Sequence, residues 1–477
     1  MRNKNVQISL FDIYTDVLTT MEEEKTQLIK LLDEHIDFDT IIPCQFYDAY
    51  HSYTGRKRVF SLESFIRALF IQRLLGMEHI SQLRTLLIFS KELRDFCGFG
   101  RKIPDAPQFT RFKQQFAGHL ELMFQRLVEL TAPICRELDQ KKSAYLIFDT
   151  TGIEPEVKEN NPKFFNSMLE AAKSNAKNAP NYDPYRGVYG LLPDVAEKAP
   201  KAKQQYINGH FCYSYKAAIL TDGLGIVRHI AFFDDDFRKA HPEVVSQKTS
   251  DPDKDKEIGD STALKPVLSD FFHAHTHRMY STFLGDAAFD SYDNYSILRN
   301  EFGFKRVCIP LNPRNSGSSS AQFNRYGNPI CPLTGEQFSC LGKCGGRHRS
   351  VRFKWVCPKS EQKGKTRVCT CETPCTDSSY GRCVYTYPDK NFRDCPGIPR
   401  NTAHWDNLYR HRVMVERTIN LFKDSFGLAH PRTRDAGTIK ADLFLAGCVQ
   451  LIGVILAKAI HQERLYNSVR AIAKITA

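Results

Sequence analysis

The pattern of apolar and polar positions predicts helices in the first third of the chain. Helical periodicity runs through the segment FSLESFIRALFIQRLLGM, and Ser61 is placed to cap its first turn. A second helical region, ISQLRTLLIFSKELRDFCGF, follows and ends near two glycines. We therefore expect residues 1–140 to form a helical N-terminal domain.

A third, shorter helix is expected after Pro107, in the segment IPDAPQFTRFKQQF. Three phenylalanines share its apolar side, and its exposed side is expected to carry Arg111, Lys113, Gln114 and Gln115. This arrangement is similar to the second half of a helix-turn-helix, in which exposed polar side chains contact DNA. A plain helical bundle explains the same pattern equally well.

The pattern changes after residue 140, where strand-like and helical segments alternate. A short apolar run over residues 144–148 is immediately followed by Asp149, and two later runs joined by TDGLG predict a β-hairpin. The segment STALKPVLSDFFHAH predicts a helix, and the strand-like STFLG is followed by Asp286. This order is typical of an α/β fold, and residues 154–207 are expected to be an insertion or long loop.

Residues 311–400 interrupt this order with polar sequence rich in glycine and cysteine, and helical character resumes near Thr402. The most apolar late stretch, residues 443–457, contains Gln450 and is too short to cross a membrane, so a buried helix is expected. The chain is therefore divided into residues 1–140 (helical, expected to bind DNA), 141–310 (first part of the α/β core), 311–400 (Cys-rich insertion, expected to bind zinc) and 401–477 (helices completing the core).

Composition favours a polyanionic partner. The 477 residues carry a formal net charge of +12, which points first to nucleic acid and second to an anionic membrane. No signal-peptide pattern opens the sequence, so a cytoplasmic, nucleoid-associated location without membrane attachment is expected. Nine of the fifteen cysteines fall between residues 331 and 395, a clustering that favours a local metal site over a disulfide framework.

Two carboxylates occupy matching positions in the α/β part. Asp149 and Asp286 each follow a strand, and residues at the carboxyl ends of neighbouring strands can converge on one crevice. Carboxylates brought together repel one another unless a cation lies between them, and a divalent metal ion is the usual solution. Taken alone, each aspartate is better explained as a turn or N-cap residue. Asp290 is an alternative to Asp286 but lies four residues farther from the strand.

A third carboxylate lies on the predicted helix YRHRVMVERTINLFK. On an α-helix, Glu416, Arg412, Tyr409 and Lys423 fall within a stripe about 80° wide, while apolar residues occupy the remaining sides. One carboxylate can bind a metal ion while neighbouring cationic and phenolic groups donate to phosphate oxygens. A solvated helix face with an Arg412–Glu416 pair is the simpler alternative.

The spacing of these four residues, Y-(2)-R-(3)-E-(6)-K, resembles the signature of bacterial insertion-sequence DDE transposases. The resemblance implies an RNase H-like core in which Asp149, Asp286 and Glu416 are catalytic and bind magnesium or manganese. It also implies that Tyr409, Arg412 and Lys423 contact transposon-end DNA.

The implied reaction is metal-dependent cleavage at transposon ends, followed by strand transfer into target DNA. Double-stranded DNA is the expected partner, and a homodimer is expected in the DNA complex. Two alternatives stay open: a transposase-derived DNA-binding protein that has lost catalysis, and a metal-dependent nuclease that cuts without joining.

The Cys-rich insertion supplies a second set of candidate ligands. Thiolates with short spacings can share one zinc ion, and the candidates are Cys340, Cys344, Cys357, Cys369, Cys371 and Cys375. Free thiols and disulfides are the alternatives. Between residues 331 and 400, thirteen Lys and Arg residues oppose six acids, which suggests a module that faces DNA. A loop-rich domain without DNA contact remains the alternative.

Overall fold

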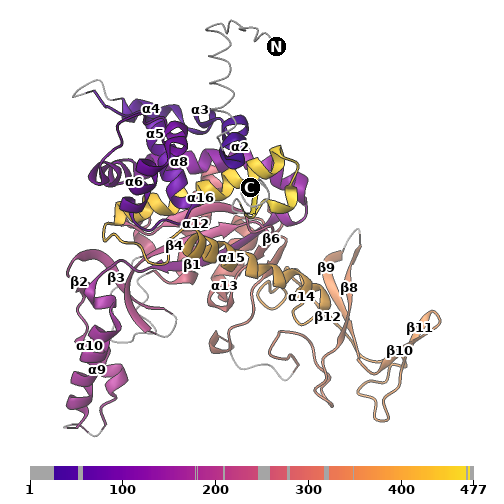
Figure 1. Cartoon of the computed structure of the whole chain (residues 1–477). Coiled ribbons are helices and arrows are strands. Elements are labelled where there is room, and N and C mark those ends of the chain that lie inside the picture. The colour runs from indigo at the N-terminus through magenta and orange to yellow at the C-terminus, as the bar shows by residue number, and fades with distance from the viewer. Residues whose placement is uncertain are drawn as a thin grey trace, which may run out of the picture.

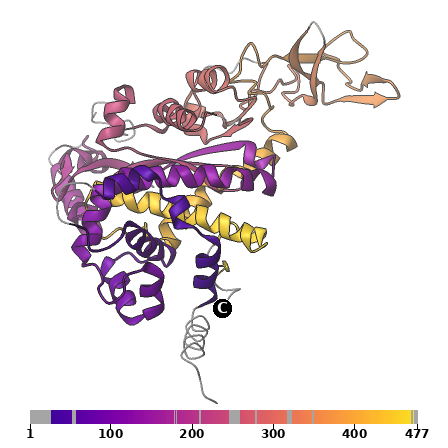
Figure 2. The same ribbon diagram turned by 90° about the horizontal axis from the view of Figure 1, so that it is seen from above.

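A computed structural model describes residues 26–51, 57–177, 179, 181–207, 210–244, 258–276, 280–315, 322–346, 349–468 and 471–472. A mixed sheet lies at the centre, with a helical layer against one face (Figure 1). Two extensions project from this body, a helical pair (α9, α10) and the Cys-rich insertion (β8–β12), and Figure 2 shows the insertion reaching beyond the helical layer.

The described residues between 26 and 140 are mainly helical, as predicted, whereas residues 1–25 and 52–56 of the predicted domain lie outside the described part of the chain. Its helices are α2 (Gln27–His35), α3 (Phe38–Ile41), α4 (Cys44–Tyr50), α5 (Leu62–Leu74), α6 (Ile80–Phe89), α7 (Lys91–Cys97) and α8 (Ala106–Leu138). The Ser61 cap is confirmed, because its hydroxyl accepts a hydrogen bond from the Ser64 amide at 3.1 Å. The second predicted helical region is two helices, α6 and α7, which meet at Ser90.

Helix α8 departs from the expectation at one side chain. Its 33 residues comprise two helices joined across a kink at Phe116 (φ −116°, ψ 18°), and the first of them is the short helix predicted for this segment. Lys113, expected on the exposed side, is 1% exposed. Its ammonium group lies 2.5 Å from Asp442 and donates to Gln72 at 2.9 Å. A partner more than 300 positions away thus reverses the orientation expected from the local pattern.

The central sheet confirms a mixed α/β architecture. Its main strands are β1 (Tyr145–Ile153), β4 (His210–Thr221), β5 (Val227–Phe232), β6 (Thr282–Leu284) and β7 (Arg306–Cys308). They lie in the order β5-β4-β1-β6-β7. Strand β4 is antiparallel to both β1 and β5, which confirms the predicted hairpin of β4 and β5, whereas β6 and β7 run parallel to β1.

The structure corrects two local predictions in this region. Strand β1 does not end before Asp149 but continues to Ile153, because β4 pairs with it along this whole length. The long loop expected at 154–207 contains regular structure: α9 (Pro162–Ala176), α10 (Pro184–Leu191), β2 (Val195–Ala196) and β3 (Ala199–Ile207). Strand β3 pairs with β4, so this segment extends the sheet.

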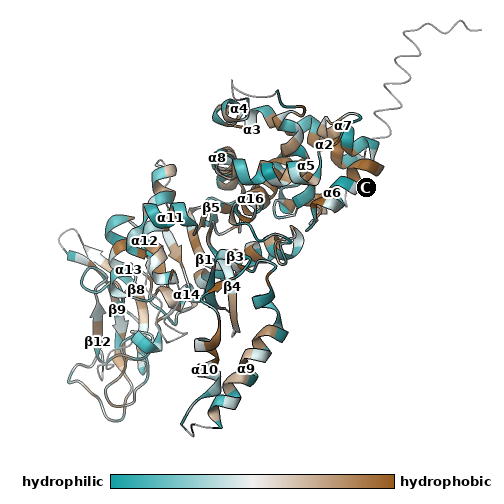
Figure 3. Ribbon diagram, turned by 90° about the vertical axis from the view of Figure 1, so that its left-hand side faces the viewer, coloured by the Kyte–Doolittle hydropathy of each residue, from teal (hydrophilic) through white to brown (hydrophobic). Residues whose placement is uncertain are grey.

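Both faces of the sheet are covered. Helices α8 and α16 (Ala436–Ala459) pack on one face, where they share a core with the N-terminal helices. Helices α12 (Asp260–Ala274) and α13 (Tyr292–Ser296) cover the other face. Figure 3 shows hydrophobic α16 enclosed among α5, α8 and β5. This helix is long and apolar enough to cross a membrane, but 89% of its most apolar window is buried inside the protein. The predicted buried helix is therefore confirmed.

The Cys-rich insertion is a small β-structure. A three-stranded sheet and a hairpin are formed by β8 (Ser339–Gly346), β9 (Arg349–Val356), β10 (Ser360–Lys363), β11 (Thr366–Cys369) and β12 (Cys383–Thr386). Its own hydrophobic core centres on Trp355, which is 1% exposed.

The segment predicted as one helix over 409–423 is helical but irregular. It comprises α14 (Ala403–Tyr409), a 3-10 turn η7 (Arg410–Arg412), α15 (Val413–Asn420) and a π-helical turn η8 (Leu421–Ser425). The remaining short elements are α11 (Asp235–Ala240), η1 (Lys142–Ala144), η2 (Lys158–Asn160), η3 (Pro242–Val244), η4 (Ala287–Phe289), η5 (Ile297–Glu301, π-helical), η6 (Pro313–Asn315) and η9 (Glu463–Leu465).

Candidate functional site

The two candidate aspartates occupy equivalent positions on neighbouring parallel strands. The pairing of β1 with β6 ends where Ile147 lies opposite Leu284. Asp149 and Asp286 each lie two residues beyond that pair, so both side chains are on the same edge of the parallel part of the sheet. Asp286 also caps the short η4 turn, because its carboxylate accepts from the Ala288 amide at 2.9 Å.

Arg412 brings the three predicted carboxylates together. Its Nη2 lies 3.2 Å from Asp149 Oδ2 and 3.9 Å from Asp286 Oδ2. Its Nη1 forms an ion pair and hydrogen bond with Glu416 Oε1, one turn away on the same helical segment. One guanidinium therefore contacts acids from β1, from the loop after β6 and from α15. These four residues are called the carboxylate cluster below.

The carboxylate cluster is open to solvent on one side. The side chains of Asp149 and Arg412 are each 18% exposed, whereas those of Asp286 and Glu416 are 36% and 44% exposed. Apolar residues of α15, including the fully buried Val415, anchor the opposite side of that helix in the core. The cluster thus has a fixed base and an accessible rim.

The electrostatics of the cluster favour a further positive charge. Burial raises the pKa of Asp149 to about 6, with the charges of Asp286 and Asp260 adding to this effect, while Arg412 and the Thr150 amide oppose it. Burial alone would lower the pKa of Arg412, but the surrounding carboxylates outweigh that effect and raise it. Arg412 therefore stays charged, and one positive charge faces three acids.

The structure adds a residue that the sequence did not suggest. Asp260, at the start of α12, accepts a hydrogen bond from Thr150 Oγ1 at 2.8 Å. Lys216 Nζ donates to Asp260 at 2.5 Å and to the Ile258 carbonyl at 2.6 Å. This network holds the backbone next to Asp149. An acid in the first turn of a helix is ordinary, so the sequence carried no signal for its role.

The two remaining residues of the signature, Tyr409 and Lys423, are not members of the carboxylate cluster. Tyr409 stacks on Trp405 with ring centroids 5.9 Å apart, and burial raises the pKa of its phenol within the field of Arg412, Asp286 and Glu416. Lys423 lies on the π-helical turn, and the charged groups acting on it are Glu154 and Asp424, not Glu416. Burial lowers the pKa of Lys423, and these acids oppose the shift. The predicted stripe assumed a regular α-helix, and Lys423 lies beyond the regular helix that carries Glu416, on a π turn that changes the angular position of residues within it.

Asp290, the alternative to Asp286, has a structural role. It is 1% exposed and forms a two-point ion pair with Arg393, at 2.9 Å to Nε and 2.7 Å to Nη2. The Asn312 amide also donates to it, at 2.7 Å. These partners occupy both of its carboxylate oxygens and tie the base of the insertion to the core.

The carboxylate oxygens are chemically suited to magnesium or manganese, which prefer oxygen ligands. In this structure they surround the Arg412 guanidinium. Within the described residues, no group of three His, Cys, Asp or Glu side chains is arranged as a metal site. The donor chemistry fits a divalent ion, and the residues that would hold one are Asp149, Asp286 and Glu416.

All fifteen cysteines lie in the described part of the chain, and none of them forms a disulfide there. The zinc candidates Cys340 and Cys344 lie on β8, whereas Cys357, Cys369, Cys371 and Cys375 follow β9 and β11. The neighbouring Cys369 raises the pKa of Cys371 to about 12, and Cys357 adds to this shift. Cys375 lies within the field of Cys331 and Cys357. These interactions connect thiols that follow β9 and β11 with one another, and none of them involves Cys340 or Cys344 on β8.

A second polar surface lies on the N-terminal helices. Gln108, Arg111 and Gln115 of α8 line a cavity of about 410 Å³ together with Lys57 and Arg58. The three α8 residues are spaced at helical intervals and therefore share one face. Arg58 is held in place because it donates to the Tyr50 carbonyl at 2.7 Å. The cavity includes two of the four residues predicted to be exposed on this helix, Arg111 and Gln115.

Comparisons with known proteins agree with these features in part. Residues 17–115 match the family model of a transposase domain (DUF772). No match was found among curated proteins. Among solved structures, the chain is similar to piggyBac transposase in a cryo-EM synaptic complex with hairpin DNA, at 10% identity and a TM-score of 0.37. That alignment covers 94% of this chain and 79% of the other. The transposase-domain match supports a transposase, whereas a structural similarity at this level does not define the fold.

Proposed function

We propose that this protein is a DDE-type DNA transposase that cleaves transposon ends and transfers them into target DNA. The observation that carries the proposal is the convergence of Asp149, Asp286 and Glu416 on Arg412. These acids come from three segments separated by more than 100 residues each. Such a convergence at an open sheet edge is typical of a catalytic centre rather than of a solvated surface.

The sheet topology also supports this proposal. A three-stranded antiparallel unit extended by two strands parallel to its first strand is the arrangement of an RNase H-like core. In the proposed core, the first aspartate lies on the central strand β1, the second follows its parallel neighbour β6, and the glutamate lies on a later helix.

The proposed chemistry is two successive displacements at phosphorus. In the first, a water oxygen attacks a phosphodiester at the transposon end, the P–O3′ bond breaks, and a 3′-hydroxyl is released. In the second, this 3′-hydroxyl attacks a target phosphodiester, forms a new P–O bond and displaces a target 3′-oxygen, which takes up a proton. No co-reactant other than water and DNA is needed.

Magnesium, when bound, would activate the attacking oxygen and stabilise the leaving one. The protein's own contribution is charge and position. The three carboxylates create a negative site beside a backbone held by the Asp260 network, and Arg412 supplies a permanent positive charge next to them. Arg412 and Tyr409 lie close enough to this site to contact the phosphate groups of a bound strand.

We also propose DNA contacts outside the catalytic centre. Lys423 is proposed to contact the end DNA near Glu154, just beyond the end of β1. The α8 face that carries Arg111, Gln114 and Gln115 is proposed to bind transposon-end DNA, since arginine and glutamine are suited to base edges in the major groove. A homodimer in the DNA complex, with both transposon ends engaged, completes the proposal.

A strand-transfer assay tests the proposed function against its alternatives. The protein is incubated with magnesium, labelled DNA carrying the terminal sequences of its own element, and a target plasmid. Joined product supports the transposase. Cut but unjoined DNA would identify a nuclease, and binding without cutting would identify a DNA-binding protein that has lost catalysis.

Structural zinc in the insertion is a separate proposal. The thiols that follow β9 and β11 interact with one another, and a cluster of free cysteines in a small β-domain is chemically suited to zinc. Elemental analysis of anaerobically purified protein should find about one zinc per chain. Protein that is folded and free of zinc would refute this proposal.

A further inference from the structure

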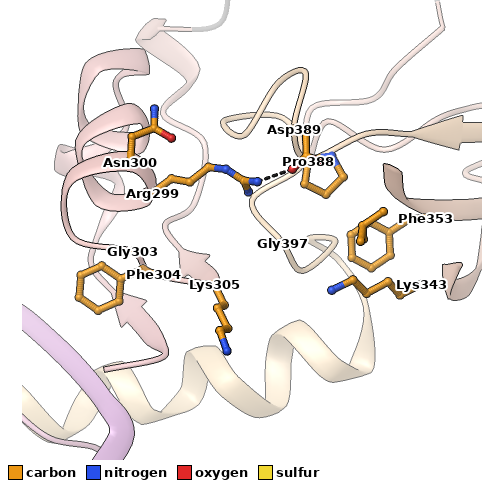
Figure 4. Close-up of a pocket in the computed structure, with 11 residues that line it drawn as sticks. Arg299, Asn300, Gly303, Phe304, Lys305, Lys343, Phe353, Pro388, Asp389 and Gly397 are labelled. Atoms are coloured by element: carbon orange, nitrogen blue, oxygen red, sulfur yellow. Dashed lines mark hydrogen bonds and ion pairs between the residues drawn. The ribbon is translucent and has the colours of Figure 1, made fainter. Parts of the chain in front are cut away.

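A cavity of about 490 Å³ lies where the Cys-rich insertion meets the core (Figure 4). Its core wall is formed by η5 and the segment leading into β7, including Arg299 and Lys305. Its insertion wall includes Lys343 on β8, Phe353 on β9 and the loop that contains Asp389. No member of the carboxylate cluster lines it, so it is a second site distinct from the proposed catalytic centre.

The charged groups of this cavity are unequal in number. Three basic side chains, Arg299, Lys305 and Lys343, face one acid, Asp389. Arg299 forms an ion pair with Asp389, and its guanidinium lies 4.6 Å from the centre of the Phe392 ring. Lys305 and Lys343 are exposed, and neither forms an ion pair within the described residues. Two ammonium groups from opposite walls are therefore left without a balancing charge.

The walls of the cavity are held in fixed positions. The buried Asp290–Arg393 ion pair joins the core to the loop that returns from the insertion. The Val307 amide donates to the Pro396 carbonyl at 3.0 Å, next to Lys305. Gly397 adopts a φ of +77° and approaches so closely that a Cβ there would lie 2.2 Å from the Lys305 carbonyl oxygen. Lys305 and the returning loop beside it are thus held in fixed positions.

The lining residues select one class of ligand. Phe304 and Phe353 are 1% and 6% exposed, so their rings are not available to stack on a base. A single carboxylate, already paired with Arg299, is a poor site for a cation. Two separated ammonium groups fit an anion that carries charges at intervals, and a nucleic-acid backbone has this property.

We propose that this cavity binds the phosphodiester backbone of a DNA strand, with Lys305 and Lys343 contacting phosphates. Arg299 acts as a positioning residue that fixes the insertion wall through Asp389. This inference rests on the proposed function, because it assigns part of the path of the bound DNA. The net positive charge of residues 331–400, thirteen basic residues against six acids, extends the same path away from the core.

The test compares two double variants with the same loss of charge. Lys305→Gln/Lys343→Gln changes the cavity, and Lys363→Gln/Lys365→Gln changes the exposed β10–β11 hairpin of the same insertion. Binding of each full-length protein to a labelled duplex of mixed sequence, and to one of its single strands, is measured over a range of salt concentrations with EDTA present. Folding of each variant is checked by thermal unfolding.

The cavity variant should bind at least one of the two probes roughly tenfold more weakly and lower the salt slope by about 2, as expected for two lost phosphate contacts. The hairpin variant should change affinity less than about threefold, and Lys305→Arg/Lys343→Arg should restore binding. Equal losses in both glutamine variants, or no loss in the cavity variant, would overturn the inference while wild-type binding persists. If the wild-type protein binds neither probe, the proposed function itself fails.

Discussion

Two clusters of charged side chains join distant parts of this chain. They differ in the ratio of cations to acids and in the solvent exposure of their side chains. The carboxylate cluster places one guanidinium among three acids, whose side chains are 18% to 44% exposed. The second cluster, called the buried triad, consists of Arg73, Lys113 and Asp442, whose side chains are at most 8% exposed. It joins α5 and α8 to α16.

The buried triad has the properties of a structural tie. Arg73 donates to the carbonyl oxygens of Met77, Phe426 and Gly427, and Lys113 donates to Gln72. Burial lowers the pKa of Lys113 to about 8, with Asp442 opposing the shift. Asp442 pairs with both cations, although Arg73 Nε and Asp442 Oδ1 have no hydrogen-bond partner among the described residues. The carboxylate cluster, in contrast, keeps excess negative charge at an open edge. Mutual repulsion there costs stability, which is the expected signature of a site kept for function.

The largest effect should come from removing any one acid of the carboxylate cluster. Asp149→Ala, Asp286→Ala or Glu416→Ala should reduce strand cleavage by roughly 10³-fold or more, because the proposed metal loses a ligand. Thermal unfolding should be unchanged or occur at a higher temperature, since repulsion is relieved. Cleavage and binding are measured on the same end-containing DNA, and binding should persist. A variant that cleaves at the wild-type rate would remove its residue from the site.

Removal of Asp442, the acid of the buried triad, should lower stability and leave the cleavage rate of the folded protein nearly unchanged. Asp442→Ala leaves Arg73 and Lys113 buried without a counter-charge and should lower the free energy of unfolding by about 3–5 kcal/mol. Denaturant titration measures this change. The matched control is Asp236→Ala, an exposed aspartate on α11 that should change stability by less than about 0.5 kcal/mol. Equal effects of the two substitutions would show that the triad is not a structural tie.

Arg412→Gln tests whether the cation of the exposed cluster serves function or folding. Cleavage should fall by roughly 10²-fold, because the carboxylates lose the positive charge between them and the proposed strand loses a phosphate contact. Arg412→Lys should retain part of the activity, and unfolding should change by less than in Asp442→Ala. Single-turnover cleavage and denaturant titration give both values. A loss of stability as large as that of Asp442→Ala would make Arg412 mainly a structural residue.

The smallest effect concerns the contact beside the buried triad. Gly427 has a φ of +72°, and a Cβ there would lie 2.7 Å from the Gly76 carbonyl oxygen. Gly427→Ala should therefore cost about 1–3 kcal/mol of unfolding free energy, from both strain and steric conflict. Gly100→Ala is the control, since Gly100 also has positive φ but a Cβ added there would have nothing within 4 Å. It should cost about 1 kcal/mol, and an equal cost at both positions would exclude the steric contribution.

Local pattern predicted much of the fold. Ser61 and the residues after it define α5 because capping and periodicity act within a few positions. The hairpin of β4 and β5, the helix α12 and the strand β6 were recognisable for the same reason. The candidate acids could also be identified. Asp149 and Asp286 follow apolar runs, and Glu416 lies at a helical spacing from Arg412.

Long-range partners explain what the pattern missed. The side chain of Lys113 turns inward because Asp442, far away in sequence, lies opposite it in the fold. Lys423 leaves the expected stripe because the helix ends in a π-helical turn, a feature that depends on tertiary packing. Asp260 approaches the sheet edge that carries Asp149 only because α12 packs against β1 and β4. None of these features can be predicted from the residues that neighbour Lys113, Lys423 or Asp260 in the sequence.

The most direct test of the central claim compares one isosteric variant from each cluster in one assay. Magnesium-dependent cleavage of end-containing DNA is measured for Asp286→Asn and Asp442→Asn, at a temperature where both proteins are folded, and is normalised to bound DNA. The exposed cluster is proposed to be catalytic and the buried triad structural. Asp286→Asn should therefore bind DNA without cutting it, while folded Asp442→Asn should cut at close to the wild-type rate. Full cleavage by Asp286→Asn would contradict the assignment of the carboxylate cluster as the catalytic centre.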